Sequence, residues 1–174
     1  MKKYLLAPII AFSLALPAWA FPSVDVAFSP EAGAEALVLK TIDSARQSIR
    51  MAAYSFTSPQ VMRKLLDAKR RGVDVQIVID AKGNKSKASK AAMNLVVNAG
   101  IPLRTISTYA IHHDKYIVVD GRTVETGSFN YSQGAAKKNS ENVIVIWNNP
   151  DVAADYLKHW ESRWEQGVPW RSEY

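Results

Sequence analysis

The chain has 174 residues and no cysteine, and its 22 Lys and Arg residues outnumber its 16 Asp and Glu residues. This length favours a single domain, and the absence of cysteine excludes disulfides, thiolate metal sites and cysteine nucleophiles. The formal net charge of +6 favours a polyanionic partner, although many proteins with such a charge bind no polyanion.

Residues 1–20 have the pattern of an export signal. Lys2 and Lys3 make the start basic, residues 5–16 are apolar, and Ala18-Trp19-Ala20 matches a small-x-small cleavage site. The apolar run of about a dozen residues is shorter than the roughly 20 residues that a membrane span needs. We therefore expect a signal peptide cleaved after about Ala20 and a periplasmic or secreted protein without stable membrane association.

Predicted strands and helices alternate along the rest of the chain. Period-two alternation or runs of β-branched residues mark the strands, and three of the helices begin with Ser or Asn followed by Pro. In chain order we expect a strand at 23–28, a helix from Ser29-Pro30 to about Gln47, a strand at 48–56, a helix from Ser58-Pro59 to Arg71, a strand at 73–80, a basic loop at 81–90, a helix that ends at Gly100, strands at 101–107, 115–120, 123–128 and 142–147, and a helix from Asn149-Pro150 to about Gln166.

This order of elements predicts an α/β fold. We expect a layered sandwich in which helices flank a central mixed sheet that is largely parallel. Strand–helix–strand units give the parallel pairs, whereas Asp120-Gly121-Arg122 predicts an antiparallel hairpin. The sequence has no internal repeat and no linker, which favours one domain over residues 21–174.

Polar side chains that could take part in catalysis lie at the start of the first strand of this hairpin and at the end of its second strand. His113 and Lys115 are two residues apart at the start of an apolar strand, so they point to the same side. Ser128 and Asn130 also share one side, and pairing of the two strands would bring them beside His113 and Lys115. Such a cluster suits a phosphodiester, which needs an attacking group and charge stabilisation on the non-bridging oxygens.

A longer pattern contains these residues at fixed spacings: His113-x-Lys115-x4-Asp120, Gly127-Ser128-x-Asn130 and Glu141-Asn142. The pattern resembles the signature of the phospholipase D superfamily. It is most similar to the small exported bacterial endonucleases of that superfamily, which carry one HKD motif per chain. The resemblance covers essentially all of residues 21–174 and implies a phospholipase D-like catalytic domain.

The resemblance also implies a role for each residue of the site. His113 attacks phosphorus and forms a covalent phosphohistidine. Lys115 and Asn130 bind the non-bridging oxygens, with Ser128 beside them. Glu141 accepts a hydrogen bond from the second nitrogen of a catalytic imidazole and fixes its tautomer. No cofactor is expected.

Asp120 does not fit the same group of catalytic residues. The five residues that separate it from Lys115 span about 17 Å of extended strand. That distance is too long for both side chains to contact one phosphate. We therefore interpret Asp120 as a structural turn residue.

A single histidine cannot easily serve both as nucleophile and as the acid that protonates the leaving group. Larger relatives supply the second group from a second copy of the motif, and this chain has one copy. The resemblance therefore implies a homodimer in which two motifs meet at the two-fold axis.

The remaining histidines are assigned to other roles. His112 has the wrong parity to point with His113, and His159 is interpreted as a residue at the surface or core edge of the last helix. His112, His113 and Asp114 are consecutive, but adjacent strand residues face opposite ways, whereas zinc needs convergent ligands. We therefore predict no metal site.

The substrate class stays open between alternatives. Nucleic acid, DNA or RNA, is favoured by basic charge, export and the resemblance, and Lys137 and Lys138 are candidate phosphate contacts. The same site could instead hydrolyse or transfer a phosphatidyl group of a phospholipid. A non-catalytic nucleic-acid-binding module is a third hypothesis, although binding alone needs no nucleophile. No base-reading motif is present, so we expect little sequence specificity.

Overall fold

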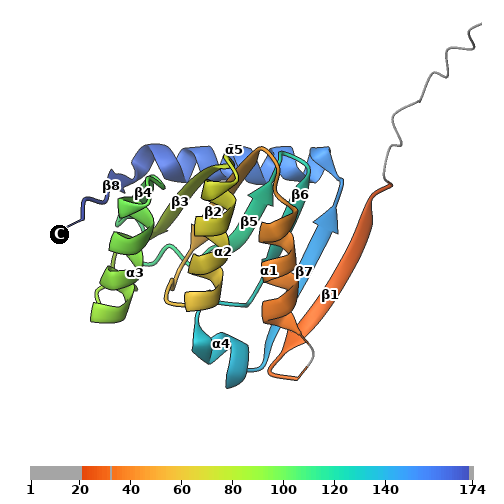
Figure 1. The fold of residues 1–174 in the computed structure, drawn as a ribbon, viewed down its shortest axis with the longest axis horizontal. Helices are drawn as coiled ribbons and strands as arrows, with labels where there is room; N and C mark the ends of the chain where they lie inside the picture. Colours follow the sequence, from red (N-terminus) through yellow and green to blue (C-terminus); the bar gives the residue numbers. More distant parts are fainter. Residues whose placement is uncertain (1–20, 32, 173–174) are drawn as a thin grey trace, which may run out of the picture.

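The computed structural model describes residues 21–31 and 33–172, and the predicted signal peptide lies outside them. Eight strands form one sheet with helices on both faces (Figure 1). The strands are β1 (Ser23–Ser29), β2 (Ser48–Ala53), β3 (Asp74–Asp80), β4 (Leu103–Ile106), β5 (Lys115–Val119), β6 (Thr123–Gly127), β7 (Glu141–Trp147) and β8 (Val168–Pro169). The helices are α1 (Ala34–Ser44), α2 (Pro59–Arg70), α3 (Lys87–Asn98), α4 (Gln133–Lys137) and α5 (Pro150–Gln166).

The strand order is β1-β7-β6-β5-β2-β3-β4-β8. The pairs β2–β3 and β3–β4 are parallel, and the other neighbouring pairs are antiparallel. The predicted mixed sheet flanked by helices is confirmed, but the expectation that most of it is parallel needs correction. The three-residue turn between β5 and β6 makes that pair antiparallel, because a parallel pair needs a crossover of a dozen or more residues.

Each face of the sheet has its own core. Helices α1, α2 and α3 lie over one face, and α5 crosses the other (Figure 1). In β5, Ile117 and Val119 pack in the α1–α3 core, whereas Tyr116 and Val118 pack in the α5 core. All five residues of β5 are buried, as expected of a strand covered on both faces.

Helix α1 begins later than the sequence predicts. Its N-cap is Gly33 and its first residue is Ala34, not the predicted Ser29-Pro30 pair. Ser29 ends β1, and its hydroxyl donates a hydrogen bond to the carbonyl oxygen of Ala135 at 2.6 Å. The hydroxyl that a helix cap would need is therefore used to hold α4.

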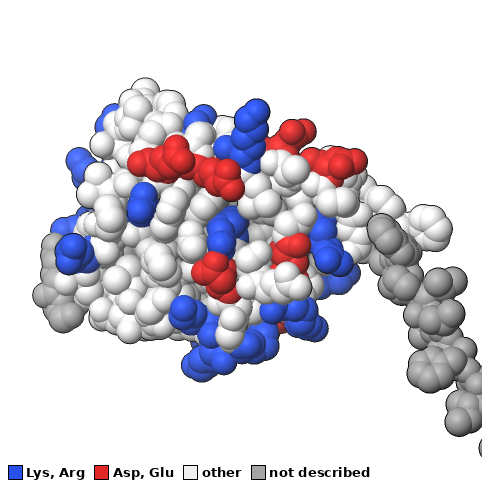
Figure 2. Space-filling model, turned by 90° about the horizontal axis from the view of Figure 1, so that it is seen from above, with Lys and Arg blue, Asp and Glu red and all other residues white. Residues whose placement is uncertain are grey.

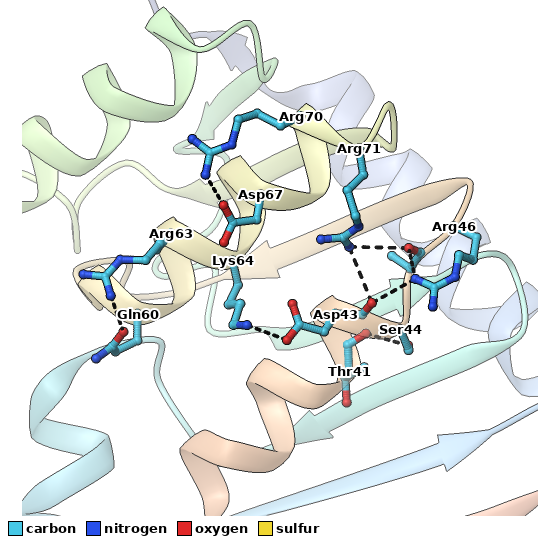
Figure 3. Close-up of polar contacts among 11 residues, drawn as sticks. Thr41, Asp43, Ser44, Arg46, Gln60, Arg63, Lys64, Asp67, Arg70 and Arg71 are labelled. Atoms are coloured by element: carbon cyan, nitrogen blue, oxygen red, sulfur yellow. Dashed lines mark hydrogen bonds and ion pairs between the residues drawn. The ribbon is translucent and has the colours of Figure 1, made fainter.

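Side chains of α2 connect it to the end of α1 (Figure 3). Lys64 forms an ion pair with Asp43 at 2.5 Å, and Arg71 donates to the carbonyl oxygens of Asp43 and Ala45. Arg46 donates to the same two carbonyls. Guanidinium groups at the last carbonyls of a helix offset its negative dipole end.

Seen from above the molecule, basic and acidic side chains are intermixed, with one denser basic cluster (Figure 2). Acidic side chains lie beside basic ones over most of this face (Figure 2). Exposed ion pairs contribute little to stability, typically about 0–1 kcal/mol.

On the face that carries α5, no helix of the described residues covers β1 and β7. Helix α5 packs against strands β2 to β6. Val24, Val26 and Phe28 of β1 point to the same side of the sheet and are 56%, 56% and 53% exposed. The register places Ile146 beside Val24 and Ile144 beside Val26. These five residues form an apolar surface, which we call the β1–β7 strip; contiguous exposed apolar surface of this kind marks interaction sites.

No helix in the part of the chain that the structure describes is long and apolar enough to cross a membrane.

A carboxyl group is buried in the α1–α3 side of the sheet. Glu125, in β6, is 1% exposed and accepts a hydrogen bond from the Tyr131 hydroxyl at 2.8 Å. Burial raises the pKa of Glu125 to about 8, and the hydrogen bond from Tyr131 acts in the opposite direction. The folded protein therefore keeps Glu125 protonated at neutral pH.

We predict that this group makes the protein less stable as the pH rises. Its pKa is about 8 when folded against a model value of 4.5, so its contribution is complete below pH 4.5 and is lost as the pH approaches 8. Glu125→Gln should remove this loss, which is at most about tenfold in the unfolding equilibrium constant per pH unit. Thermal unfolding measured across this pH range tests it, with the exposed Glu161→Gln as control. Parallel pH profiles for wild type and Glu125→Gln would contradict the prediction.

Candidate active site

The site forms where the last residues of β2 and β3 lie beside the first residue of β5. We call this border of the sheet, which runs across the strand ends, the site edge. Strand β5 is antiparallel to β2, and Lys115 at its start pairs with Ala53 at the end of β2. Because β3 is parallel to β2, its end at Asp80 lies at this edge too. The connection from β4 to β5 therefore delivers His112 and His113 to the edge where β2 and β3 end.

Two contacts hold this connection to the loop after β3. The buried carboxylate of Asp80 accepts a hydrogen bond from the backbone N–H of His112 at 2.7 Å. The ammonium group of Lys82 donates to the carbonyl oxygens of Tyr109 and Ala110 at 3.2 and 3.0 Å. The backbone around His113 is thus fixed by groups from β3 and from the loop that follows it.

Tyr54 contacts both of the first two predicted catalytic residues. The exposed ring of His113 meets the Tyr54 ring edge-on, with 4.8 Å between ring centroids. The Lys115 ammonium lies 5.3 Å from the centroid of the same ring and donates to the carbonyl oxygen of His113 at 2.8 Å. His113 and Lys115 are therefore neighbours, as their two-residue spacing predicts. Tyr54 was not identified from the sequence, because a tyrosine just after a strand carries no distinctive signal.

Lys115 supplies a partly desolvated positive charge. It is 7% exposed, and burial lowers the pKa of its ammonium group, while the carboxylates of Glu141 and Asp114 act in the opposite direction. A cation in such a position interacts more strongly with an anion than it would in water. Next to the exposed imidazole of His113, it can stabilise the non-bridging oxygens of a phosphodiester.

The strand alternation that would align Ser128 with His113 ends at Gly127. A Cβ atom on Gly127 would lie 2.2 Å from the carbonyl oxygen of Asn142, and this carbonyl accepts a hydrogen bond from the Ser128 N–H at 3.1 Å. The backbone of β7 therefore occupies the space that the missing side chain of Gly127 leaves. The Ser128 hydroxyl donates to Glu141 at 2.5 Å.

Each carboxylate oxygen of Glu141 accepts one hydrogen bond from its own chain. One carboxylate oxygen accepts the Ser128 hydroxyl, and the other accepts the side-chain amide of Asn139 at 2.9 Å. Among the residues that the structure describes, no hydrogen bond joins Glu141 to His113. The bond from a catalytic imidazole that the sequence predicts for Glu141 is therefore not made within a single chain.

Asn130 lies on a rigid turn. Its neighbours Phe129 and Tyr131 are completely buried, and the Tyr131 carbonyl accepts the backbone N–H groups of Thr57 and Ser58. The side-chain oxygen of Asn130 is buried and has no hydrogen-bond partner in the described structure. Unpartnered buried polar atoms are rare, and sites that act on a ligand are one place where they occur.

Asp120 lies at the opposite end of β5 from Lys115. Its carboxylate accepts the backbone N–H groups of Arg46, Gln47 and Ser48 at 2.9, 2.8 and 2.8 Å. Asp120 also has a positive φ of 52°. These contacts fasten the α1–β2 connection to the β5–β6 turn, and they are the contacts of a structural residue.

A pocket of about 410 Å³ opens between the start of β5 and helix α5. Its lining includes His113, Lys115 and Tyr116 from the β5 side and Asp155, Tyr156 and His159 from α5. The sequence interpretation placed His159 outside the site, but it lies on the pocket wall. The spacing of residues 155, 156 and 159 on one helix face was the available signal, but sequence does not show which strand that face meets.

Asp114 connects the other two histidines. One of its carboxylate oxygens lies 2.9 Å from Nε2 of His159 and 3.3 Å from Nδ1 of His112. Burial lowers the pKa of His112, and the charge of Asp114 acts in the opposite direction. Across residues 21–31 and 33–172, no three His, Asp or Glu side chains are placed to hold a metal ion.

The chain is similar to known proteins in sequence and in fold. Residues 38–164 match the family described as the cardiolipin synthase, phospholipase D (PLD)-like domain. The chain is 39% identical over 140 residues to a phospholipase D of Rickettsia bellii, which covers 80% of this chain and 68% of that protein. It is 32% identical over 132 residues to the mitochondrial cardiolipin hydrolase of Homo sapiens, which covers 76% of this chain and 51% of that protein.

Solved structures agree with this assignment. Nuc from Salmonella typhimurium, a phospholipase D family member, is 59% identical with a TM-score of 0.86 over 87% of this chain and 100% of that chain. NucT from Helicobacter pylori has a TM-score of 0.72 at 21% identity over 86% of this chain and 100% of that chain, which shows a common fold. The predicted superfamily and the predicted hydrolase class are confirmed. The chain belongs to the phospholipase D superfamily and is a phosphodiester hydrolase.

Proposed function

We propose that this phosphodiesterase is an exported, non-specific endonuclease that cleaves DNA or RNA without a metal ion. The observation that carries the proposal is a set of lysines around the site that have no carboxylate partner in the described structure. These are Lys82, Lys85, Lys87 and Lys90 after β3, and Lys137 and Lys138 at the end of α4.

The position of these lysines fits a long polyanion. Lys82 contacts the backbone just before His113, and Lys138 lies three residues before Glu141. A nucleic acid carries phosphates on both sides of the one that is cleaved, and flanking cations bind them. A single phospholipid headgroup has no such neighbours. The likeness to Nuc at 59% identity also exceeds the likeness to the proteins named phospholipase D and cardiolipin hydrolase.

Phospholipid is the second candidate substrate. It is favoured by the names of those relatives, phospholipase D at 39% identity and mitochondrial cardiolipin hydrolase at 32%. The β1–β7 strip is also an exposed apolar surface that a lipid layer would cover. Hydrolysis assays on both substrates decide between the two candidates.

The proposed chemistry has two steps. A nitrogen of His113 attacks phosphorus, the bond from phosphorus to the leaving oxygen breaks, and an acid protonates that oxygen. Water then attacks the phosphohistidine, releases His113 and leaves its proton on the same acid. Lys115 and Asn130 bind the non-bridging oxygens throughout, and Glu141 fixes the tautomer of a catalytic imidazole.

The acid comes, on this proposal, from His113 of the partner subunit. The β1–β7 strip leads to the site, because Phe28 pairs with Asn142 and Ser29 pairs with Glu141. A second copy that covers the strip about a two-fold axis buries the same apolar residues of both subunits. It also brings the two site edges together.

The first prediction that follows from this function concerns metal independence. Because Lys115 supplies the positive charge at the phosphate, cleavage of plasmid DNA by the purified protein should continue at an unchanged rate in excess EDTA. Loss of cleavage in EDTA with recovery in Mg²⁺ would disprove the phosphohistidine mechanism. Phosphatidylcholine vesicles serve as the parallel substrate, and hydrolysis of these alone would favour the second candidate.

The second prediction concerns the number of sites in a dimer. A purified heterodimer of wild type and His113→Asn, assembled from differently tagged chains, should lose activity by at least about 10²-fold, because it keeps either the attacking group or the acid. Independent sites would leave half of the wild-type activity. That result, or full activity in a monomer, contradicts the shared site.

The third prediction concerns the β1–β7 strip. Val26→Glu places a charge in the proposed interface, so it should give a monomer by light scattering with activity reduced by at least about 10²-fold. Val168→Glu is the matched control, since Val168 is 65% exposed in β8 at the opposite edge of the sheet. Both variants should keep the wild-type circular dichroism spectrum. A dimeric, active Val26→Glu protein would show that the strip is not the interface.

A further inference from the structure

We propose that the pocket between β5 and α5 binds the nucleobase of a nucleotide next to the cleaved phosphate and prefers bases with an exocyclic amino group. This inference rests on the proposed nucleic acid substrate. The pocket shares His113 and Lys115 with the site, so a group bonded to the reacting phosphate through its sugar lies at the pocket mouth. Its volume of about 410 Å³ is in the range of small-ligand sites.

The pocket has an aromatic wall. The rings of Tyr116 and Tyr156 meet edge-on at 4.9 Å between centroids, and the ring of His159 lies 5.9 Å from that of Tyr116. Tyr156 and His159 are three residues apart on α5 and therefore share one face of the helix. Aromatic side chains beside a nucleic-acid site serve as stacking platforms for bases of any sequence.

The carboxylates on the side of the pocket away from Lys115 disfavour a second phosphate. Asp155 is exposed, and in the described structure its carboxylate has no hydrogen bond or ion pair. Asp114 lies in the same pocket, where its carboxylate contacts His159. Two carboxylates repel the phosphate chain, so the backbone of the substrate passes outside the pocket and a base enters it.

The same carboxylates select among bases. Carboxylate oxygens accept hydrogen bonds, and cytosine and adenine present amino groups where thymine presents a carbonyl oxygen. A second polar group is also unused, since the buried hydroxyl of Tyr116 has no partner in the described part of the chain. The pocket thus gives the enzyme a modest base preference at one position, whereas the lysines bind every sequence alike.

The test is the distribution of cut ends in a random single-stranded DNA library. Thymine should be depleted at one position beside the cut by about fivefold, the lower end of discrimination by such a contact. Asp155→Asn, which can donate as well as accept, should remove most of this depletion. Asp151→Asn is the matched control, because Asp151 is exposed in the first turn of the same helix and does not line the pocket.

A second variant tests the aromatic wall. Tyr156→Leu should raise KM for DNA by at least about fivefold, which is the lower end of the loss of one stacking contact. The KM for bis(p-nitrophenyl) phosphate, which has no nucleobase, should change less. Unfolding temperatures of both variants separate this effect from a loss of fold.

The outcomes distinguish this inference from the proposed function. DNA cleavage with equal base frequencies at both flanking positions overturns the base pocket and leaves the endonuclease intact. A depletion of thymine that is the same in wild type and in Asp155→Asn also overturns it. Hydrolysis of phosphatidylcholine vesicles without cleavage of DNA overturns the proposed function and the base pocket together.

Discussion

The arrangement of the site depends on one buried carboxylate. Asp80 is 1% exposed at the end of β3, and its two oxygens accept the backbone N–H groups of His112 and Gly83. The first bond fixes the backbone beside His113, and the second fixes the loop that carries Lys82 and Lys85. A buried carboxylate is stable only when it is fully hydrogen-bonded, so Asp80 keeps both segments in place. The proposed nucleophile and the proposed phosphate-binding loop therefore hold a fixed position relative to each other.

The family motif combines chemistry and architecture along one strand. Lys115 begins β5 beside His113, whereas Asp120 follows its other end and binds three backbone N–H groups. The last three residues of the strand between them, Ile117, Val118 and Val119, are buried and apolar. The length of this strand sets the distance from the site to the turn that Asp120 holds. The fixed spacing of the motif thus reflects the length of a buried strand and not a cluster of three catalytic groups.

The sequence predicted what depends on local periodicity and turn chemistry. The two-residue spacing correctly predicts that His113 and Lys115 are neighbours, although β5 begins only at Lys115, and most strands and helices follow from their patterns. The position of Ser128 could not be predicted, because the alternation stops where Gly127 packs against Asn142. Tyr54 and His159 were missed for another reason. They reach the site from β2 and α5, and a local pattern does not show which distant elements meet.

The position of α5 links the pocket to the proposed dimer. The indole of Trp160 donates to the carbonyl oxygen of Met51 at 2.9 Å, which fixes the helix across β2 in the middle of the sheet. A helix held there brings Tyr156 and His159 beside the start of β5, and it packs against β2 to β6. Among the residues that the structure describes, no helix then covers the apolar side of β1 and β7. The same contact that builds the pocket wall therefore leaves open the surface that a second subunit would cover.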